Sequence, residues 1–170
     1  MYLKKIDSYL NASSVVVKSK YMADDYRSFF MERKGEGEGK AADLQSFQNW
    51  DGPLNPDVNI LEYTVKDRNW SIKFNEQNDF SKLIGFPGWK GSMSISFNTK
   101  GLIREAIYIP DSTNPSYKPW LQPALDWLEK NMPAELKTVY QDKKLVKNEV
   151  AANRWKVLLK RWRDQKKTVN

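Results

Sequence analysis

The chain has 170 residues and a formal net charge of +7, and it contains neither cysteine nor histidine. These absences exclude disulfide bonds, thiolate zinc sites, cysteine nucleophiles, serine–histidine–aspartate triads and nearly every histidine-based metal site, so we expect no cofactor and no metal. Any catalysis must use Asp, Glu, Tyr, Lys or Arg. Seven Trp, eight Tyr and seven Phe supply apolar area for one folded domain over residues 1–170.

The positive charge is concentrated near the end of the chain. Residues 143–167 hold ten Lys and Arg against two acidic residues, which leaves the rest of the chain nearly neutral. No apolar run reaches the roughly 20 residues that a membrane helix needs, and the first residues lack the apolar segment of a signal peptide. We therefore expect no membrane span and a cytoplasmic location, or a secreted or periplasmic one if a leader has been removed.

The first third of the chain is mainly helical in its residue pattern. Apolar residues at helical spacing predict a short amphipathic helix over residues 2–11, and Ser13 or Ser14 can cap a second short helix. An aromatic-rich segment, 24–33, favours a strand that ends at the flexible GEGEG loop. Helical spacing then returns over 40–50 and stops at a Gly-Pro pair.

The apolar period then changes to two, which is typical of strands. Four such segments, rich in β-branched and aromatic residues, cover 58–66, 69–78, 92–98 and 102–109. Short turns join the first segment to the second and the third to the fourth, so these pairs must be antiparallel. Between the second and third segments, residues 80–91 predict a short helical turn followed by a loop. After them, helical spacing predicts helices over 119–130, 134–140 and 148–163. This order predicts an α+β domain whose helices cover one face of the sheet.

Four segments between Lys40 and Asp111 carry a family resemblance: KAADLQSFQNWDGPLN, VNILEYTVKDRNWSIKFNEQNDF, SKLIGFPGW and SMSISFNTKGLIREAIYIPD. They resemble the nuclear-transport-factor-two-like superfamily, which includes ketosteroid-isomerase-like and SnoaL-like proteins. The likeness is greatest to uncharacterised bacterial members with a Trp-Asp-x-x-Leu-Asn turn and a Glu-x-Asn-Asp-Phe strand end. It implies a cone-shaped, strongly curved antiparallel sheet wrapped around N-terminal helices, with a pocket at the open end. Residues 1–111 would form this core, and 112–170 a helical extension packed on it.

The second strand of the predicted meander carries the first candidate site. Side chains alternate along a strand, so Trp70, Glu76 and Asn78 share one face, which begins apolar and ends polar. A carboxylate flanked by Phe74 and Phe80 could have a raised pKa and act as a general base or acid. The alternative is that Glu76 is exposed at a strand end and only solvated.

Further candidates lie in the turn before the meander and at its end. Asp51 could project into the same cavity, but Asp51 and Asn55 could instead close the turn by bonding their own backbone. Trp50 is a candidate for the pocket and for the core, and Tyr108 could face either the pocket or the outer side of the sheet. The resemblance assigns no catalytic residue. The candidate ligand pocket therefore comprises Trp50, Asp51, Asn55, Trp70, Glu76, Asn78 and Tyr108.

These observations leave three functional hypotheses. The leading one is a domain that binds a small, partly apolar molecule, with isomerase-, cyclase- or hydrolase-like chemistry on it. The alternative is a non-catalytic interaction module, in which the outer face of the sheet or the Trp-rich C-terminal helices form a homodimer. The third is binding of nucleic acid or an anionic surface by the basic face of the last helix, formed by Lys156, Lys160, Arg163 and Lys167. A docked amphipathic helix with a solvated basic face explains that pattern, so no nucleic-acid partner is favoured.

Overall fold

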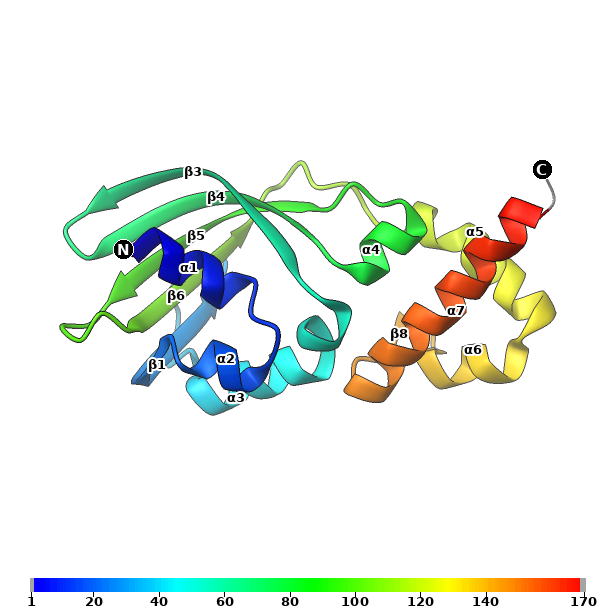
Figure 1. Ribbon diagram of the computed structural model, residues 1–170, viewed down its shortest axis with the longest axis horizontal. Helices are drawn as coiled ribbons and strands as arrows, with labels where there is room; N and C mark the ends of the chain where they lie inside the picture. The colour runs from blue at the N-terminus through cyan, green and yellow to red at the C-terminus, as the bar shows by residue number, and fades with distance from the viewer. Residues whose placement is uncertain (1, 169–170) are drawn as a thin grey trace.

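A sheet forms one end of the molecule and a group of helices the other (Figure 1). The computed structural model describes residues 2–168, with the side chains of 2–166. In this range the strands of the main sheet are β1 (Met22–Phe30), β2 (Glu38–Gly39), β3 (Asp57–Lys66), β4 (Asn69–Gln77), β5 (Trp89–Phe97) and β6 (Ile103–Pro110). The helices are α1 (Tyr2–Leu10), α2 (Val15–Ser19), α3 (Lys40–Ser46), α4 (Asp79–Ile84), α5 (Lys118–Asn131), α6 (Pro133–Val139) and α7 (Glu149–Thr168).

The main sheet has the strand order β2-β1-β6-β5-β4-β3. The predicted antiparallel meander from β3 to β6 is confirmed, and so is the α+β class. The expectation of a wholly antiparallel sheet was wrong at one place, because β1 pairs with β6 in parallel. The rule that short turns give antiparallel pairs does not apply there, since α3 and the whole meander lie between these two strands. The strong curvature that the resemblance implies stays a prediction.

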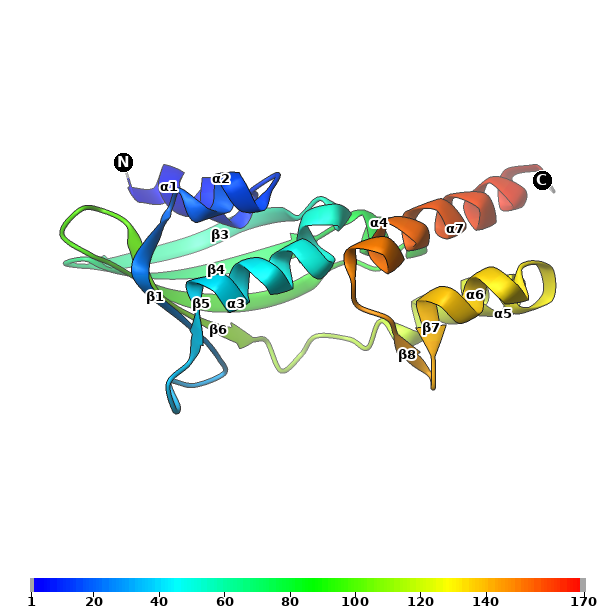
Figure 2. The same cartoon turned by 90° about the horizontal axis from the view of Figure 1, so that it is seen from below.

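Helices α1, α2 and α3 lie over one face of the sheet (Figure 2). Ser14 caps α2, as one of the two predicted caps, by accepting a hydrogen bond from the backbone N–H of Val17. From α1, Ile6 and Tyr9 pack into an apolar cluster with Ile72 of β4. Burial of such side chains contributes most of the stability of short helices like these, which would be marginal alone.

Helix α3 continues into a π-helical turn, η1 (Phe47–Asp51), and a short 3-10 turn, η2 (Gly52–Leu54). A π turn carries more residues per turn than an α-helix, so it rotates the following side chains away from the α-helical stripe. Phe47 is buried beside α2, whereas Trp50 packs against Phe80 with ring centroids 6.0 Å apart. Regular α-helical spacing would place Phe47 and Trp50, which are three positions apart, on the same side of the helix. The π turn instead directs them to different parts of the structure.

A second apolar cluster joins the C-terminal helices to α4 and the η turns. At its centre Trp155 of α7 is fully buried, meets Phe80 edge to face at 5.6 Å, and donates its indole N–H to the carbonyl of Val139. A small hairpin, β7 (Tyr140–Gln141) and β8 (Lys144–Leu145), connects α6 to α7. These helices extend beyond one end of the sheet (Figure 1), and the division into a 1–111 core and a 112–170 extension stays a prediction.

The basic face of α7 is partly engaged by the protein itself. The ammonium of Lys156 donates to the carbonyl of Pro53, and the guanidinium of Arg163 donates to the carbonyl of Lys82 at 3.5 Å. Lys160 is exposed, and the side chain of Lys167 lies outside the described residues. None of the described helices is both long and apolar enough to cross a membrane.

Candidate functional site

A cavity of about 190 Å³ lies between the N-terminal helices and the inner face of the sheet. Phe47, Val58 and Met93 form part of its apolar wall. Besides Tyr9 of α1, three carboxyl side chains and one amine line it, and they come from four elements, which are α2, α3, η1 and β4. We call this space the carboxyl cavity and define it by those four residues, Lys18, Asp43, Asp51 and Glu76.

A larger hollow of about 670 Å³ adjoins the carboxyl cavity and shares Asp43 and Asp51 with it. Its other walls include Phe30 at the end of β1 and Tyr108 of β6, whose ring centroids lie 5.5 Å apart. Burial, with Glu76 nearby, raises the pKa of the Tyr108 hydroxyl. The two spaces together offer one small chamber rich in carboxyls and a wider, partly aromatic one beside it.

Glu76 is held by strands on both sides. In the sheet register it pairs with Val58 of β3 and with Trp89 of β5, so its backbone is fixed in a central position. Burial raises the pKa of its carboxyl to about 7, the nearby charge of Asp51 adds to the shift, and Lys18 opposes it. A carboxyl with a pKa near 7 is populated in both protonation states at neutral pH, so it can accept or donate a proton there.

Asp51 ends the π turn and is the second carboxyl with a perturbed pKa. Burial raises its pKa, the ammonium groups of Lys18 and Lys147 lower it, and Asp43 raises it further. Two neighbouring carboxyls in a poorly solvated site cannot both ionise easily, because each disfavours the charge on the other. The charge of Asp51 accordingly contributes to the raised pKa of Glu76.

Lys18 is the cationic member of the cavity and is only 8% exposed. Its ammonium lies 3.8 Å from the centre of the Tyr9 ring and 4.9 Å from that of Phe47, and it donates to the Tyr9 carbonyl at 3.5 Å. Burial lowers the pKa of this amine, although Asp43, Asp51 and Glu76 act in the opposite direction. The sequence analysis missed Lys18, and its one signal was a single lysine within the otherwise apolar segment VVVKS.

Two buried tyrosines connect α1 and β1 to α3. The hydroxyls of Tyr9 and Tyr26 lie 2.7 Å apart, and Tyr26 donates to the carboxylate of Asp43 at 3.2 Å. Burial raises the pKa of both hydroxyls, so both stay protonated at neutral pH. This chain of hydrogen bonds orients Asp43 at the edge of the cavity. It could not be predicted from the sequence, because Tyr9, Tyr26 and Asp43 lie on three separate elements.

The comparisons with known proteins found similarity in structure but not in sequence. No protein-family model matches the chain, and no curated protein matches it. A protein of unknown function with a cystatin-like fold from Methylobium petroleophilum PM1 matches with a TM-score of 0.52 at 16% identity, over 68% of this chain and 78% of that one. The Delta 5-3-ketosteroid isomerase from Mycobacterium sp. matches with a TM-score of 0.50 at 15% identity, over 62% and 89%. A computationally designed 17-OHP binder gives 0.50 at 17% identity, over 62% and 88%.

The chain has the nuclear-transport-factor-two-like fold. Identities this low establish the fold alone, and a fold does not specify an activity. Within this fold the structure places three of the seven candidate pocket residues around the two adjoining spaces. Asp51 lines both, Glu76 lines the carboxyl cavity, and Tyr108 lines the larger hollow.

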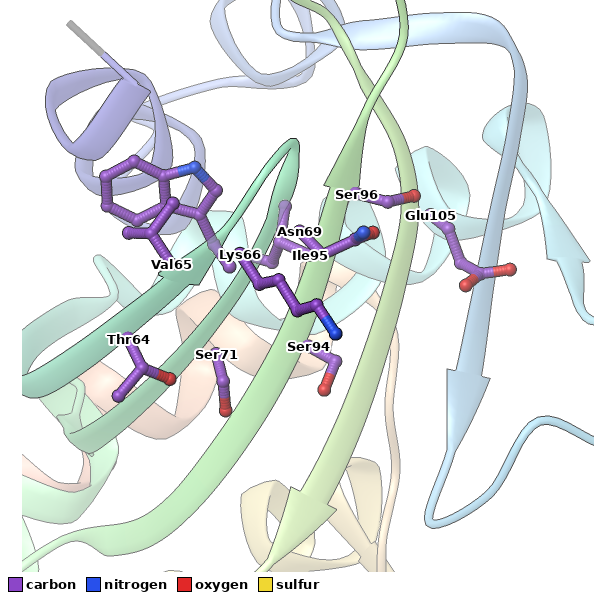
Figure 3. A pocket seen from close by; sticks show the side chains of 10 residues that line it. Thr64, Val65, Lys66, Asn69, Ser71, Ser94, Ile95, Ser96 and Glu105 are labelled. Atoms are coloured by element: carbon purple, nitrogen blue, oxygen red, sulfur yellow. The ribbon is translucent and has the colours of Figure 1, made fainter.

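Two candidate tryptophans lie away from the carboxyl cavity. Trp50 faces the second apolar cluster because of the π turn. Trp70 is on the same strand as Glu76, but six residues separate them, which is about 20 Å along an extended chain. Trp70 stacks on Tyr63 with centroids 5.5 Å apart and lines a surface hollow with Ser71 (Figure 3). Sharing a face therefore did not bring these two residues together.

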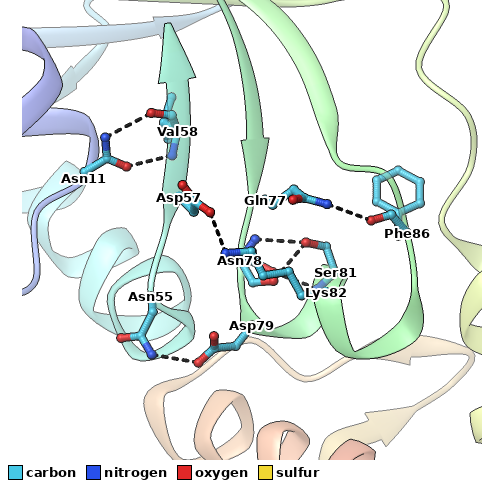
Figure 4. A network of polar contacts seen from close by, with 10 residues as sticks. All are labelled: Asn11, Asn55, Asp57, Val58, Gln77, Asn78, Asp79, Ser81, Lys82 and Phe86. Carbon is cyan, nitrogen blue, oxygen red and sulfur yellow. Dashed lines mark hydrogen bonds and ion pairs between the residues drawn. The ribbon is translucent and has the colours of Figure 1, made fainter.

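The two candidate asparagines stabilise the chain near α4 instead (Figure 4). Asn55 donates its amide to the carboxylate of Asp79 at 2.7 Å. Asn78 is the N-cap of α4, where its side chain accepts from the backbone N–H of Ser81 and the Ser81 hydroxyl accepts from the N–H of Asn78, both at 2.9 Å. Asn78 caps its helix as asparagine commonly does. The side chain of Asn55 bonds Asp79 and not its own backbone, so the turn-closing alternative does not describe it.

Proposed function

We propose that this protein binds a small, partly apolar molecule in the carboxyl cavity and that Glu76 transfers a proton to or from it. The observation that carries this proposal is a carboxyl with a pKa of about 7 that lines a cavity with an apolar wall. Catalytic acids and bases need a pKa near the working pH, and perturbed groups in cavities are candidates for that role. The isomerase found among the structural matches is consistent with such chemistry.

The size of the cavity limits the ligand. A cavity of about 150 Å³ is known to hold a benzene ring, so the roughly 190 Å³ here suits a molecule with a single ring or a short branched chain. Phe47, Val58 and Met93 would contact its apolar part. A polar or acidic C–H group would face Glu76, and longer substituents could extend towards the adjoining hollow beside Tyr108.

The proposed step is abstraction of a proton by ionised Glu76, followed by its return to another atom of the same molecule. The partner carboxyl of Asp51 disfavours a second negative charge nearby, which strengthens the tendency of Glu76 to take up a proton. Asp43, held by Tyr26, would present a fixed carboxylate at the edge of the cavity. Proton transfer by a positioned side chain contributes about 10²- to 10⁴-fold to a rate.

A chromogenic base-catalysed reaction tests this step without knowledge of the natural substrate. In the elimination of 5-nitrobenzisoxazole, whose isoxazole ring would face Glu76 while the fused nitrobenzene ring extends towards the adjoining hollow, a base removes the ring C–H proton, the N–O bond breaks, and a coloured cyanophenolate forms. The rate with the wild-type chain should rise with pH and level off above about pH 7, where Glu76 is ionised. Glu76→Gln should reduce the rate about 100-fold or more, because an amide cannot accept the proton.

The matched control is Glu62→Gln, which removes an exposed carboxylate of β3 that pairs with Lys73 at 2.9 Å on the surface. This variant should keep the wild-type rate and pH profile. Equal rates for Glu76→Gln and the wild-type chain would contradict proton transfer by Glu76. Saturable inhibition of the reaction by an unreactive single-ring compound would show that the chemistry takes place in a binding site.

A further inference from the structure

Lys18 belongs to the carboxyl cavity, and proton transfer by Glu76 makes no use of it. The amine is carried by α2, whose N-terminal cap Ser14 fixes the start of this short helix. It lies over the Tyr9 ring and beside Phe47, in a wall that also carries three carboxyls. Among the described residues, no carboxylate oxygen is within 4.0 Å of its nitrogen. A lysine buried to this extent normally has an ion-pair partner.

Burial increases the fraction of this amine that is neutral. Taking an ammonium out of water disfavours its charge, and the aromatic rings of Tyr9 and Phe47 compensate only in part. The groups that face Lys18 from other elements are the carboxyls of Asp43, Asp51 and Glu76, which favour the charged form. Burial outweighs them and lowers the pKa of the amine. A neutral lysine amine in an apolar site is a nucleophile towards carbonyl carbon.

We propose that the Lys18 amine condenses with a small aldehyde or ketone in the carboxyl cavity to form an imine. The nitrogen lone pair attacks the carbonyl carbon, and the electron pair of the C=O bond moves to oxygen, which takes up a proton. Loss of that oxygen as water and of the amine protons leaves a C=N bond to Lys18. The atoms balance as amine plus carbonyl compound giving imine plus water, with no oxidant or reductant.

The other groups of the cavity suit this chemistry. Glu76, with both protonation states populated near neutral pH, can protonate the departing oxygen and then accept a proton from nitrogen. The volume of about 190 Å³ admits an aldehyde on a single ring. The inference rests on the proposed binding of small molecules in this cavity, and it names their chemical class as carbonyl compounds.

Reductive trapping tests the inference on the wild-type chain. The protein is incubated with benzaldehyde and sodium cyanoborohydride at neutral pH, and any imine is reduced to a stable benzylamine. Peptide mapping by mass spectrometry then locates the added benzyl groups and separates Lys18 from the N-terminal amine. Lys18 should be modified several-fold faster than the exposed Lys20 close by, because a lowered pKa raises the fraction of the amine that is neutral.

Two substitutions sharpen the result. Lys18→Met should remove the fast modification, while Lys20→Met should leave it unchanged. Benzyl groups spread over exposed lysines, with Lys18 no faster than Lys20, would overturn the inference. The wild-type map alone distinguishes these outcomes, so the test does not depend on whether Lys18→Met folds. A failure here is distinct from a failure of the proposed function, since the elimination of 5-nitrobenzisoxazole involves Glu76 and no amine.

Discussion

Replacing Glu76 with Gln removes a carboxyl that titrates inside the protein while keeping the size of the side chain. The pKa of Glu76 is raised from 4.5 to about 7, so the folded protein holds this proton more tightly than the unfolded chain does. Between these two values the folded state binds more protons, and the free energy of unfolding of the wild-type chain therefore falls as the pH rises. Glu76→Gln has no carboxyl at this position, so its free energy of unfolding does not fall for this reason.

The magnitude follows from the two pKa values. Their separation, at about 1.4 kcal/mol per pH unit, sets an upper bound of about 3 kcal/mol for the destabilising effect of ionised Glu76. Water can enter the cavity and the side chain is partly exposed, which screens the charge and reduces the effect. We expect Glu76→Gln to be more stable than the wild-type chain by about 1 to 2 kcal/mol at about pH 8, with the gain absent near pH 4.

Urea unfolding followed by tryptophan fluorescence measures this difference at a series of pH values. The gap between Glu76→Gln and the wild-type chain should open between about pH 4.5 and pH 7 and stay constant above that range. Glu62→Gln is the control, because Glu62 is exposed and lies outside the cavity. A gap for Glu76→Gln that is the same from pH 4 to pH 8 would refute the reasoning, since it would mean that Glu76 titrates alike in both states.

Three further predictions concern the framework of the site, and chemical or thermal unfolding measures each. Asn78→Ala should lower the free energy of unfolding by about 1 to 2 kcal/mol, because it removes the cap of α4. An unchanged unfolding midpoint would contradict that role. Tyr26→Phe should cost about 1 to 3 kcal/mol, because Tyr9 loses its hydrogen-bond partner in a buried site; no loss would show that the hydroxyls are not coupled. Trp155→Ala should cost about 3 to 5 kcal/mol, while Trp120→Ala, at a 42% exposed residue, should cost about 1 or less; equal effects would contradict the described core.

The homodimer hypothesis stays a prediction. The edge strand β3 exposes the side chains of Leu61, Tyr63 and Val65, which a second copy of the chain could cover. The surface hollow in Figure 3 is more polar, because Ser71 and Ser94 on neighbouring strands present their hydroxyls there. Sedimentation velocity over a range of concentrations distinguishes a monomer from a dimer. A stable monomer at the highest concentration would count against the interaction-module hypothesis.

The meander could be predicted from the sequence because its signals are local. An apolar period of two reveals each strand, and a short turn fixes the antiparallel pairing of the two strands that it joins. All of these signals lie within about 50 residues of the chain. The parallel pairing of β1 with β6 could not be predicted in this way, since it joins segments separated by the whole meander. The two-residue strands β2, β7 and β8 are too short to show a period at all.

The site was only partly predictable for the same physical reason. Glu76 could be found because an acidic residue at the end of an apolar strand face is visible in the sequence. Asp51 was a second candidate, from the turn before the meander. Lys18 and Asp43 could not be found, because they come from two other elements that only packing brings to the cavity. For Trp50 the sequence left pocket and core open, and the π turn, which α-helical periodicity does not anticipate, places it against the second apolar cluster.

The pKa of Glu76 tests the central claim most directly. Carbon-13 NMR of the side-chain carboxyl, assigned by its loss in Glu76→Gln, follows protonation of this one group in the intact protein. The structure predicts a midpoint of about 7, which would place a proton-transfer group in the carboxyl cavity at neutral pH. A midpoint near the ordinary value of 4.5 would show a solvated, permanently ionised carboxylate and would contradict the proposed function.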